Sequence, residues 1–204
     1  MERYPVVYIM DGRENLERGQ LPGLFDAEIR SGRLPPLMAV FVPHRGRSRD
    51  HEYTPYFRRS RLDAFHRFIT EELVPFVDST FRTRQERDAR VLLGQSFGGT
   101  LVTTLAARAP HLFRHVLAQS GVYVWGRRHI TPLYAQGGFR DLRLYLDGVA
   151  NRTEQFQNHH MVQALKAGGY PHFYRALPSR HEYEDWRERV PDGLRYLWFG
   201  ITPE

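Results

Sequence analysis

The sequence predicts an α/β protein in which a mostly parallel sheet carries helices on both faces. Short runs of β-branched and aromatic residues alternate along the chain with segments whose apolar residues recur at helical spacing. The runs are continuously apolar, as is typical of parallel strands that are buried on both faces. The chain has 204 residues, of which 41% are hydrophobic, and this is enough for one sizeable core. We therefore expect a single domain over residues 1–204.

Six short runs are predicted to be strands. The first reads PVVYIM over residues 5–10 and stops at Asp11-Gly12, and the second, over 37–42, stops at Pro43. Gly, Pro and Asp end strands because they favour turns, and because proline also lacks a donor for the sheet. The other four strands are expected over residues 90–93, 116–119, 142–146 and 173–177.

Four helices are expected between these strands. They cover residues 24–32, 60–81, 100–108 and 153–167. The helix over 60–81 has the clearest apolar periodicity, and Pro75 is expected to kink it. Two connections, over residues 44–59 and 122–139, are longer than simple connection requires. We expect these two loops to help build the functional site.

The composition excludes several classes of protein. The net charge is +6, but all except one of the 29 basic residues are arginine, and they are scattered along the chain. This pattern predicts no nucleic-acid partner and is typical of a GC-rich, bacterial genome. The absence of cysteine excludes a disulfide framework and a cysteine nucleophile. No apolar stretch is long enough for a signal peptide or a membrane span, so we expect a soluble, cytoplasmic protein with no membrane partner.

The strongest chemical signal is the segment GQSFG over residues 94–98, which stands between a predicted strand and a predicted helix. A serine nucleophile on so sharp a turn needs neighbours without Cβ atoms, and glycine provides them. The helix that follows points its positive end at negative charge that develops near the serine. We therefore predict that Ser96 is a nucleophile and that the backbone N–H of Phe97 is one oxyanion donor.

A serine hydroxyl needs a base to take its proton, and histidine has a suitable pKa. Where a serine lies on this kind of turn, the acid and then the histidine follow it along the chain. Of the ten histidines, His181 fits best, because it follows the strand over 173–177 in the loop PSRHEYEDW. None of the ten has a metal-binding spacing such as HExxH, so no metal or other cofactor is expected.

Two carboxylates are candidates for the acid that orients the histidine. Asp147 directly follows the strand over 142–146, and Glu154 opens the next helix. Each also has an ordinary structural explanation, Asp147 in a turn with Gly148 and Glu154 as a negative charge at a helix N-terminus. Chain order allows both, and Glu154 is the first choice with Asp147 as the alternative.

Seven segments, in matching order, carry a resemblance to a known family. They are YPVVYIMDG, RDHEYTP, EELVPFVDSTF, LLGQSFGG, APHLFRHVLAQSG, NRTEQFQNHHMVQALKAGGY and LPSRHEYEDWRERVP. Together they resemble the putative esterase family, which contains enterochelin esterase, esterase D and feruloyl esterase modules. The most specific segments are the serine turn and the His-x-x-x-x-Trp loop. The resemblance implies an α/β-hydrolase fold and a catalytic pair made by Ser96 and His181.

The resemblance also assigns further residues. The acid of this family commonly stands in a Gly-Thr-x-Glu or Gly-Thr-x-Asp turn after a strand, which points to Glu154. After the strand–Asp–Gly turn at residues 11–12, the backbone N–H of Arg13 would complete the oxyanion hole.

This chain departs from the family pattern in two places. Members usually carry further strands ahead of residues 5–10, so we expect a sheet that lacks the usual first strands. A partner subunit in a homo-oligomer is expected to cover the exposed sheet edge. The family often has two glycines before the histidine, where this chain has Ser179-Arg180, which brings a guanidinium to the mouth of the site.

Charged and aromatic loop residues are expected to contact substrate. They are Arg49, Tyr53, Tyr123, Trp125, Arg180 and Trp186. Such a rim suits an aryl ester or an anionic, siderophore-type ester. The sequence therefore predicts a serine carboxylesterase that cleaves a small-molecule ester through an acyl-enzyme on Ser96. The alternatives are an acyltransferase that uses the same triad, and a catalytically silent binding or assembly module.

Overall fold

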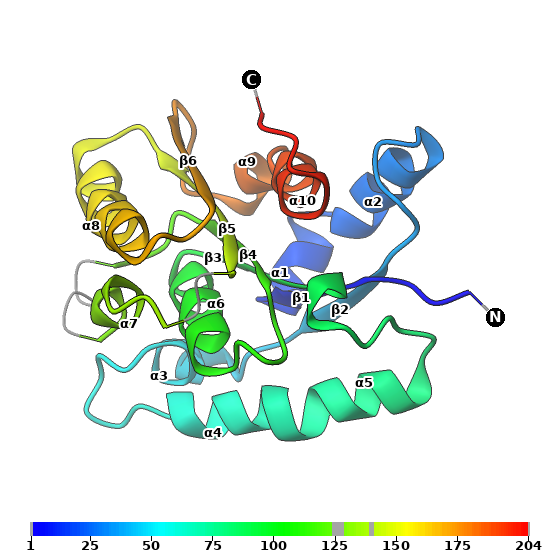
Figure 1. Cartoon of the computed structure of the whole chain (residues 1–204), viewed down its shortest axis with the longest axis horizontal. Helices are drawn as coiled ribbons and strands as arrows, with labels where there is room; N and C mark the ends of the chain where they lie inside the picture. Colours follow the sequence, from blue (N-terminus) through cyan, green and yellow to red (C-terminus); the bar gives the residue numbers. More distant parts are fainter. Residues whose placement is uncertain (1, 124–128, 139–140, 204) are drawn as a thin grey trace.

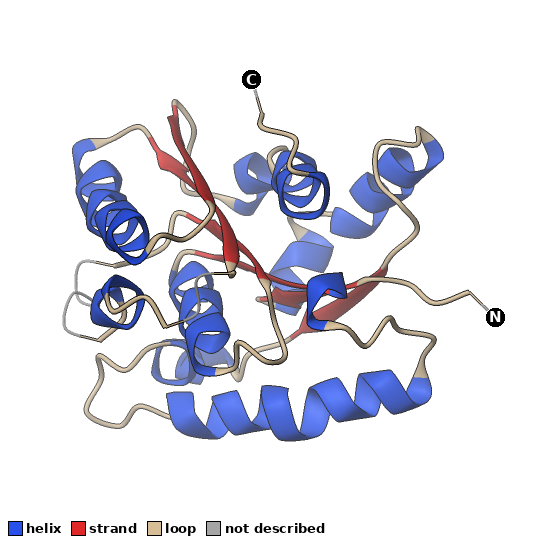
Figure 2. Cartoon of the chain, viewed as in Figure 1, coloured by secondary structure: helices blue, strands red, loops and turns tan. Residues whose placement is uncertain are grey.

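The computed structural model describes residues 2–123, 129–138 and 141–203. Within these residues, six parallel strands form one sheet in the order β2-β1-β3-β4-β5-β6 (Figure 1, Figure 2). The strands are β1 (Val6–Met10), β2 (Met38–Val42), β3 (Arg90–Gln95), β4 (His115–Gln119), β5 (Arg143–Val149) and β6 (His172–Leu177). All six predicted strands and their parallel arrangement are therefore confirmed.

The helices surround the sheet and include the four that the sequence predicts. The α-helices of the described residues are α1 (Gly12–Glu17), α2 (Leu21–Arg30), α3 (Arg49–Tyr53), α4 (Leu62–Arg67), α5 (Val74–Thr80), α6 (Phe97–Arg108), α7 (Thr131–Ala135), α8 (Arg152–Gly168), α9 (Tyr183–Arg187) and α10 (Val190–Phe199). Short 3₁₀ turns form η1 (Gly46–Ser48) and η3 (Arg87–Ala89). The sequence did not predict α1, α3, α7, α9 or α10, and four of these five are only five or six residues long.

The predicted helix over residues 60–81 is one continuous rod, seen along the lower edge of Figure 1. In it, α4 passes into a π-helical segment, η2 (Phe68–Leu73), and then into α5. Pro75 lies in the first turn of α5 and has no N–H to donate to the preceding turn. The wider π-helical turns just before Pro75 accommodate this missing hydrogen bond. The distortion that the sequence predicts at Pro75 thus takes the form of a π-helical stretch.

Side chains of β1 alternate between two apolar clusters, one on each face of the sheet. Tyr8 and Met10 belong to a cluster that also holds residues of α4, α5, α6 and α8. Val7 and Ile9 belong to a second cluster, which includes residues of α2 and α10. This alternation explains why the strand is apolar at every position.

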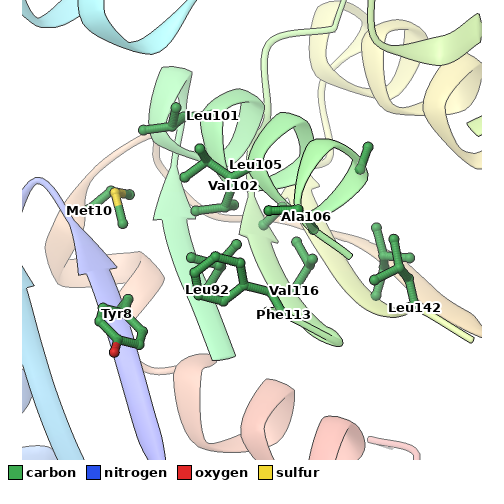
Figure 3. Packing of buried hydrophobic residues seen from close by; sticks show 14 of the residues in the cluster. Tyr8, Met10, Leu92, Leu101, Val102, Leu105, Ala106, Phe113, Val116 and Leu142 are labelled. Carbon is green, nitrogen blue, oxygen red and sulfur yellow. The ribbon is translucent and has the colours of Figure 1, made fainter. Parts of the chain in front are cut away.

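The helix that follows the serine turn is anchored in the first of these clusters (Figure 3). Leu101, Leu105 and other apolar residues of α6 are buried over Leu92 of β3 and Val116 of β4. Burial of each large side chain contributes about 1.5 to 3 kcal/mol relative to its exposure. The N-terminus of α6 is therefore held firmly above the end of β3.

Because all six strands are parallel, their carboxyl ends meet at one edge of the sheet. Asp11 follows β1, Ser96 follows β3 and Ser120 follows β4. Asp147 lies in the last half of β5, and the loop after β6 contains His181. Ligands of open α/β sheets bind at this edge. The topology therefore gathers the residues that the sequence predicts to be chemically active.

No helix in the described part of the chain combines the length and the apolar character that crossing a bilayer requires. Strand β2 forms one edge of the sheet, and its side chains are only partly buried except for Val42. The expected cover of this edge by a second copy of the chain stays a prediction.

His115 begins β4 and is only 5% exposed. Burial, together with the guanidinium groups of Arg114 and Arg143, lowers its pKa to about 4. The unfolded chain takes up this proton near pH 6.5 and the folded chain only near pH 4, so this group destabilises the fold as the pH falls through that window. We expect His115→Gln to reduce the loss of unfolding free energy between these pH values by about 3 kcal/mol. Urea denaturation at a series of pH values measures this, and an equal loss in both proteins would contradict it.

Candidate active site

Ser96 occupies a strained turn between β3 and α6. Its backbone has φ 55° and ψ −123°, a region that residues with a Cβ rarely adopt. A Cβ added at Gly94 would lie 2.3 Å from the carbonyl oxygen of Gly98, so glycine is required there. The N–H of Ser96 donates to the carbonyl oxygen of Gln119 at 2.9 Å, which ties the turn to the end of β4. The local geometry is that of a nucleophile elbow.

The strained backbone of Ser96 has a measurable consequence. Glycine adopts positive φ without steric cost, whereas alanine keeps the Cβ that causes the strain. We expect Ser96→Gly to unfold with a free energy about 1 kcal/mol higher than that of Ser96→Ala. Chemical denaturation of the two variants measures the difference, and a Gly variant less stable than the Ala variant would show that the turn stores no strain.

His181 is paired with Glu154 at the same edge of the sheet. Nδ1 of His181 lies 2.9 Å from Oε1 of Glu154. The second carboxylate oxygen of Glu154 accepts a hydrogen bond from the N–H of Val149 at 2.8 Å. The N–H of Glu154 donates to the side chain of Asn151, which caps α8. The carboxylate is thus fixed from both β5 and α8, and it faces the histidine.

The environment keeps Glu154 ionised. Burial alone would raise the pKa of this carboxyl, but hydrogen bonds from His181, from the N–H of Val149 and from Ser120 outweigh the burial. The pKa of Glu154 therefore lies below its ordinary value. A carboxylate that stays charged at neutral pH is suited to orient a histidine and to stabilise its protonated form.

Asp147, the alternative acid, is fully buried and has different partners. Its carboxylate accepts hydrogen bonds from Nε of Arg189 and from Nε2 of Gln119, each at 3.0 Å. Burial raises the pKa of Asp147, and the guanidinium of Arg189 opposes that rise. The structure therefore pairs Glu154, and not Asp147, with His181. Asp147 instead joins β5 to the residue that precedes α10.

Arg49 of α3 holds the turn after β1 against the elbow. Its Nε and Nη2 atoms each lie 2.6 Å from a carboxylate oxygen of Asp11. The same Nη2 atom donates to the carbonyl oxygen of Gln95 at 3.3 Å. Asp11 has a positive φ of 53°, and its N–H donates to the hydroxyl of Tyr53 at 3.1 Å. The ion pair and the tyrosine thus fix the conformation of this turn beside the elbow.

Among the described residues, a group of three side chains near the Asp11 turn has a spacing that could suit a metal ion. Asp11, Glu14 and His44 offer ligand atoms within 4.8 Å of one another. Both carboxylate oxygens of Asp11 already bind the guanidinium of Arg49, and His44 lies 3.0 Å from Glu14. The guanidinium of Arg49 would repel a metal cation at this point. The arrangement of the three side chains is therefore better explained by the contacts of Asp11 with Arg49 and of Glu14 with His44.

The two predicted oxyanion donors lie at the starts of two helices. Phe97 is the first residue of α6, and Arg13 is the second residue of α1. Backbone N–H groups in a first turn lie at the positive end of a helix. The side chain of Arg13 is exposed and binds Glu17 at 2.8 Å, so any catalytic contribution of Arg13 comes from its backbone.

The structure corrects the predicted substrate contacts at three positions. Tyr53 and Tyr123 are fully buried, and Trp186 is only 2% exposed, so their side chains do not reach a substrate. Tyr123 lies in the apolar cluster with α6, and Tyr53 supports the turn after β1. Loop position alone predicted exposure, but these aromatic rings pack inward because their apolar surface is large.

The other three predicted substrate contacts are Arg49, Arg180 and Trp125. Arg49 is about four-fifths buried and its guanidinium is engaged by Asp11. Arg180 is well exposed, and its guanidinium lies 3.1 Å from Asp185. Trp125 lies outside the described residues. Of the five predicted contacts that lie within the described residues, Arg180 is the one whose side chain is well exposed, and it directly precedes His181.

Sequence reasoning missed a buried polar network that supports the site. Gln119 donates to the backbone carbonyl of Trp186 at 2.9 Å as well as to Asp147. The indole N–H of Trp186 donates to the hydroxyl of Ser120 at 3.0 Å. Polar residues at the carboxyl ends of apolar strands, such as Gln95 and Gln119, were the available signal.

A serine on a strained strand–helix turn, with a histidine–carboxylate pair at the same edge of a parallel sheet, defines an α/β-hydrolase. The chain belongs to the putative esterase family, whose model matches residues 1–197. The resemblance seen in the sequence is thereby confirmed.

The chain is also similar to individual proteins that are named as esterases. The chain is 28% identical over 220 residues to the iron(III) enterobactin esterase of Dickeya dadantii, an alignment that covers 98% of this chain and 49% of the relative. It is 24% identical over 194 residues to an endo-1,4-beta-xylanase/feruloyl esterase of Xylanibacter ruminicola, covering 91% of this chain and 25% of the relative. The chain thus spans half or less of the length of these two relatives.

A solved structure confirms the predicted α/β-hydrolase fold. Enterochelin esterase from Shigella flexneri superposes with a TM-score of 0.85 at 22% sequence identity. The superposition covers 98% of this chain and 52% of that chain.

Proposed function

We propose that this protein is a serine esterase in which Ser96 is the nucleophile, His181 the base and Glu154 the orienting acid. The observation that carries the proposal is the His181–Glu154 pair, located at the sheet edge where the strained turn presents Ser96. Membership of the putative esterase family supports the same reaction class.

The reaction begins with acylation of the serine. Nε2 of His181 takes the hydroxyl proton of Ser96 as Oγ attacks the ester carbonyl, and Glu154 holds the imidazole in the tautomer that leaves Nε2 free to accept. The protonated imidazole then gives its proton to the leaving alcohol. Water repeats the sequence on the acyl-enzyme, which releases the acid and restores Ser96.

The tetrahedral intermediate requires donors for its oxyanion. The N–H groups of Phe97 and Arg13 are the proposed pair, and each such donor contributes about 3 to 4 kcal/mol to lowering the barrier. Arg49 supports this arrangement because it links the turn before Arg13 to the carbonyl of Gln95, immediately before Ser96. Arg49 is therefore proposed as a positioning residue for the oxyanion hole.

The proposed substrate is a small-molecule ester with an aromatic acyl group, of the aryl or siderophore type. A pocket of about 450 Å³ is lined by Pro55, Tyr56, Phe57 and His129. The ring of Phe57 meets the ring of Phe97 edge to face at 6.5 Å, so the pocket lies next to the residue that follows the nucleophile. Aromatic walls of this kind favour a flat aromatic group through stacking and edge contacts. The named activities of the enterobactin esterase and feruloyl esterase relatives agree with this choice.

Labelling with a fluorophosphonate tests the proposed reaction. We expect the wild-type protein to be labelled once, with the adduct located by mass spectrometry on the peptide that contains Ser96, and to hydrolyse p-nitrophenyl acetate. His181→Ala is expected to remove both activities while the protein stays folded. A folded wild-type protein that neither reacts nor turns over would contradict the proposal. In active protein, a panel of aryl, alkyl and siderophore esters then identifies the acyl preference, and added alcohols distinguish hydrolysis from acyl transfer.

A further inference from the structure

A cavity of about 430 Å³ lies at the amino edge of the sheet, and this size suits a small-molecule ligand. Several of the residues that line it stand where strands begin. Pro5 directly precedes β1, His115 is the first residue of β4 and Arg143 is the first residue of β5. Ser96 and His181 follow the carboxyl ends of β3 and β6, so they lie at the other edge of the sheet. The cavity is therefore separate from the proposed catalytic residues.

Positive charge exceeds negative charge on the cavity wall. Arg84, Arg114 and Arg143 line the cavity, and Asp88, which also lines it, is bound to Arg114 at 2.7 Å. Nη1 of Arg143 donates to the backbone carbonyl oxygen of Leu197 at 3.2 Å, and no carboxylate of the described residues forms an ion pair with this guanidinium. A guanidinium offers several N–H donors in a planar fork. Arg143 thus keeps donors available for an anionic ligand.

Two ring nitrogens of the lining residues are buried without a hydrogen-bond partner in the described part of the chain. They are Nδ1 of His115 and Nε1 of Trp198. His115 is only 5% exposed, and the neighbouring guanidinium groups of Arg114 and Arg143 disfavour its protonation. The indole nitrogen of Trp198 can only donate, and a buried donor without an acceptor costs free energy. An acceptor bound in the cavity would offset this cost.

The rest of the cavity wall is largely apolar. Leu197, Trp198 and Phe199, the last three residues of α10, form one part of it, and Pro5 and two other small or ring-shaped residues form another. An indole ring favours a flat aromatic group through stacking and edge contacts. A guanidinium pairs with a carboxylate through two parallel hydrogen bonds. The wall therefore combines a surface for a ring with a fork for a carboxylate.

We propose that this cavity binds a small aromatic carboxylate, whose carboxylate group pairs with Arg143 and whose ring packs against Trp198. An inorganic anion would leave the apolar wall uncovered, and a neutral aromatic molecule would leave the guanidinium of Arg143 without a counter-charge. The site does not involve Ser96, so the proposal does not depend on the esterase function.

An NMR titration of the isotope-labelled full chain with benzoate tests this site. The acid released by the proposed esterase is of the same chemical class, so the titration must also show where benzoate binds. We expect the indole N–H signal of Trp198, assigned with Trp198→Phe, to move to saturation while that of Trp186, which contacts His181, stays in place. The pKa of His115 should rise from about 4, because a bound carboxylate offsets the guanidinium charges. Movement of the Trp186 signal alone would place benzoate at the other edge and overturn the proposal.

Arginine variants test the charged half of the site. Arg143→Gln should raise the Kd for benzoate by about tenfold to hundredfold, since a charge-assisted contact is lost. Arg143→Lys keeps the charge without the fork and should raise it by about threefold to tenfold. Arg180→Gln is the matched control beside His181, and its Kd should equal that of the wild type. If Arg143→Gln does not fold, Arg84→Gln replaces it, because the ion pair of Arg84 with Glu86 is long at 3.7 Å, and its Kd should rise about threefold.

Two smaller probes separate the contributions of the ring and the charge. Acetate lacks the ring and benzamide lacks the charge, and each should bind at least about tenfold more weakly than benzoate. Acetate that binds as tightly as benzoate would overturn the assignment to an aromatic ligand, and benzamide that does so would overturn the role of Arg143. An unchanged Kd in a folded Arg143→Gln or Arg84→Gln variant would overturn the placement of the site. These measurements need no ester turnover, so a protein that fails the fluorophosphonate test can still confirm this site.

Discussion

Ser96→Ala is expected to reduce ester turnover by about 10⁴-fold or more and to abolish fluorophosphonate labelling, with little change in stability. The size of the loss follows from the proposed covalent mechanism, in which removal of Oγ prevents the acyl-enzyme and leaves the remaining residues to assist only the direct attack of water. Alanine keeps the Cβ and the strained backbone of Ser96, so the fold should persist. The measurement is kcat/KM for p-nitrophenyl acetate together with the circular dichroism spectrum and the thermal midpoint.

The matched control for this substitution is Ser79→Ala. Ser79 lies on the exposed surface of α5, and its hydroxyl bonds only the carbonyl of Phe76 in its own helix. We expect this variant to retain full activity and labelling. If Ser96→Ala kept measurable single-site labelling, the nucleophile would have to be another residue.

The serine turn could be predicted from the sequence because its signal is local. Gly94 is required by its close approach to the carbonyl oxygen of Gly98 in the same segment, and the flanking strand and helix have clear apolar patterns. The strands could be predicted for the same reason, since each is a short apolar run that is ended by a turn residue. The prediction of His181 used the order of serine, acid and histidine together with its position after the last predicted strand.

The roles of the other charged and aromatic residues depended on partners that are distant in the sequence. Arg49 was expected to face substrate, but its partner Asp11 lies 38 residues away. Tyr123 was expected at the rim, yet the surrounding core leaves no exposed surface for it. Position in a loop predicts neither which arginine is paired nor which ring is buried, because both depend on how separate elements pack together.

The choice between the two candidate acids was also beyond the sequence. Asp147 lies in β5 and Glu154 lies in α8, so both stand between Ser96 and His181 in the permitted order, and each carries the same charge. What separates them is Arg189, 42 residues beyond Asp147, whose guanidinium occupies the Asp147 carboxylate and leaves Glu154 to meet His181. Only the folded chain contains that information.

Matched carboxylate-to-amide substitutions at these two positions should therefore give opposite results. Glu154→Gln keeps an oxygen for the N–H of Val149 but loses the charge that orients His181 and stabilises its protonated form. We expect a fall in kcat of about 10² to 10⁴-fold with near wild-type stability. Asp147→Asn leaves the guanidinium of Arg189 buried without its counter-charge, so we expect the unfolding free energy to fall by about 3 to 5 kcal/mol.

The two properties are measured on the same samples, kcat below the unfolding transition of each variant and stability by urea denaturation. In the fraction of the Asp147→Asn variant that remains folded, kcat should stay within a few-fold of the wild-type value, because the Asp147 side chain binds Gln119 and Arg189 and not His181. A catalytic loss in folded Asp147→Asn together with an active Glu154→Gln would reverse the assignment of the acid. The expected pattern would instead show that the two carboxylates have different functions. Asp147 stabilises the fold by joining β5 to Arg189, which precedes α10, and Glu154 orients His181.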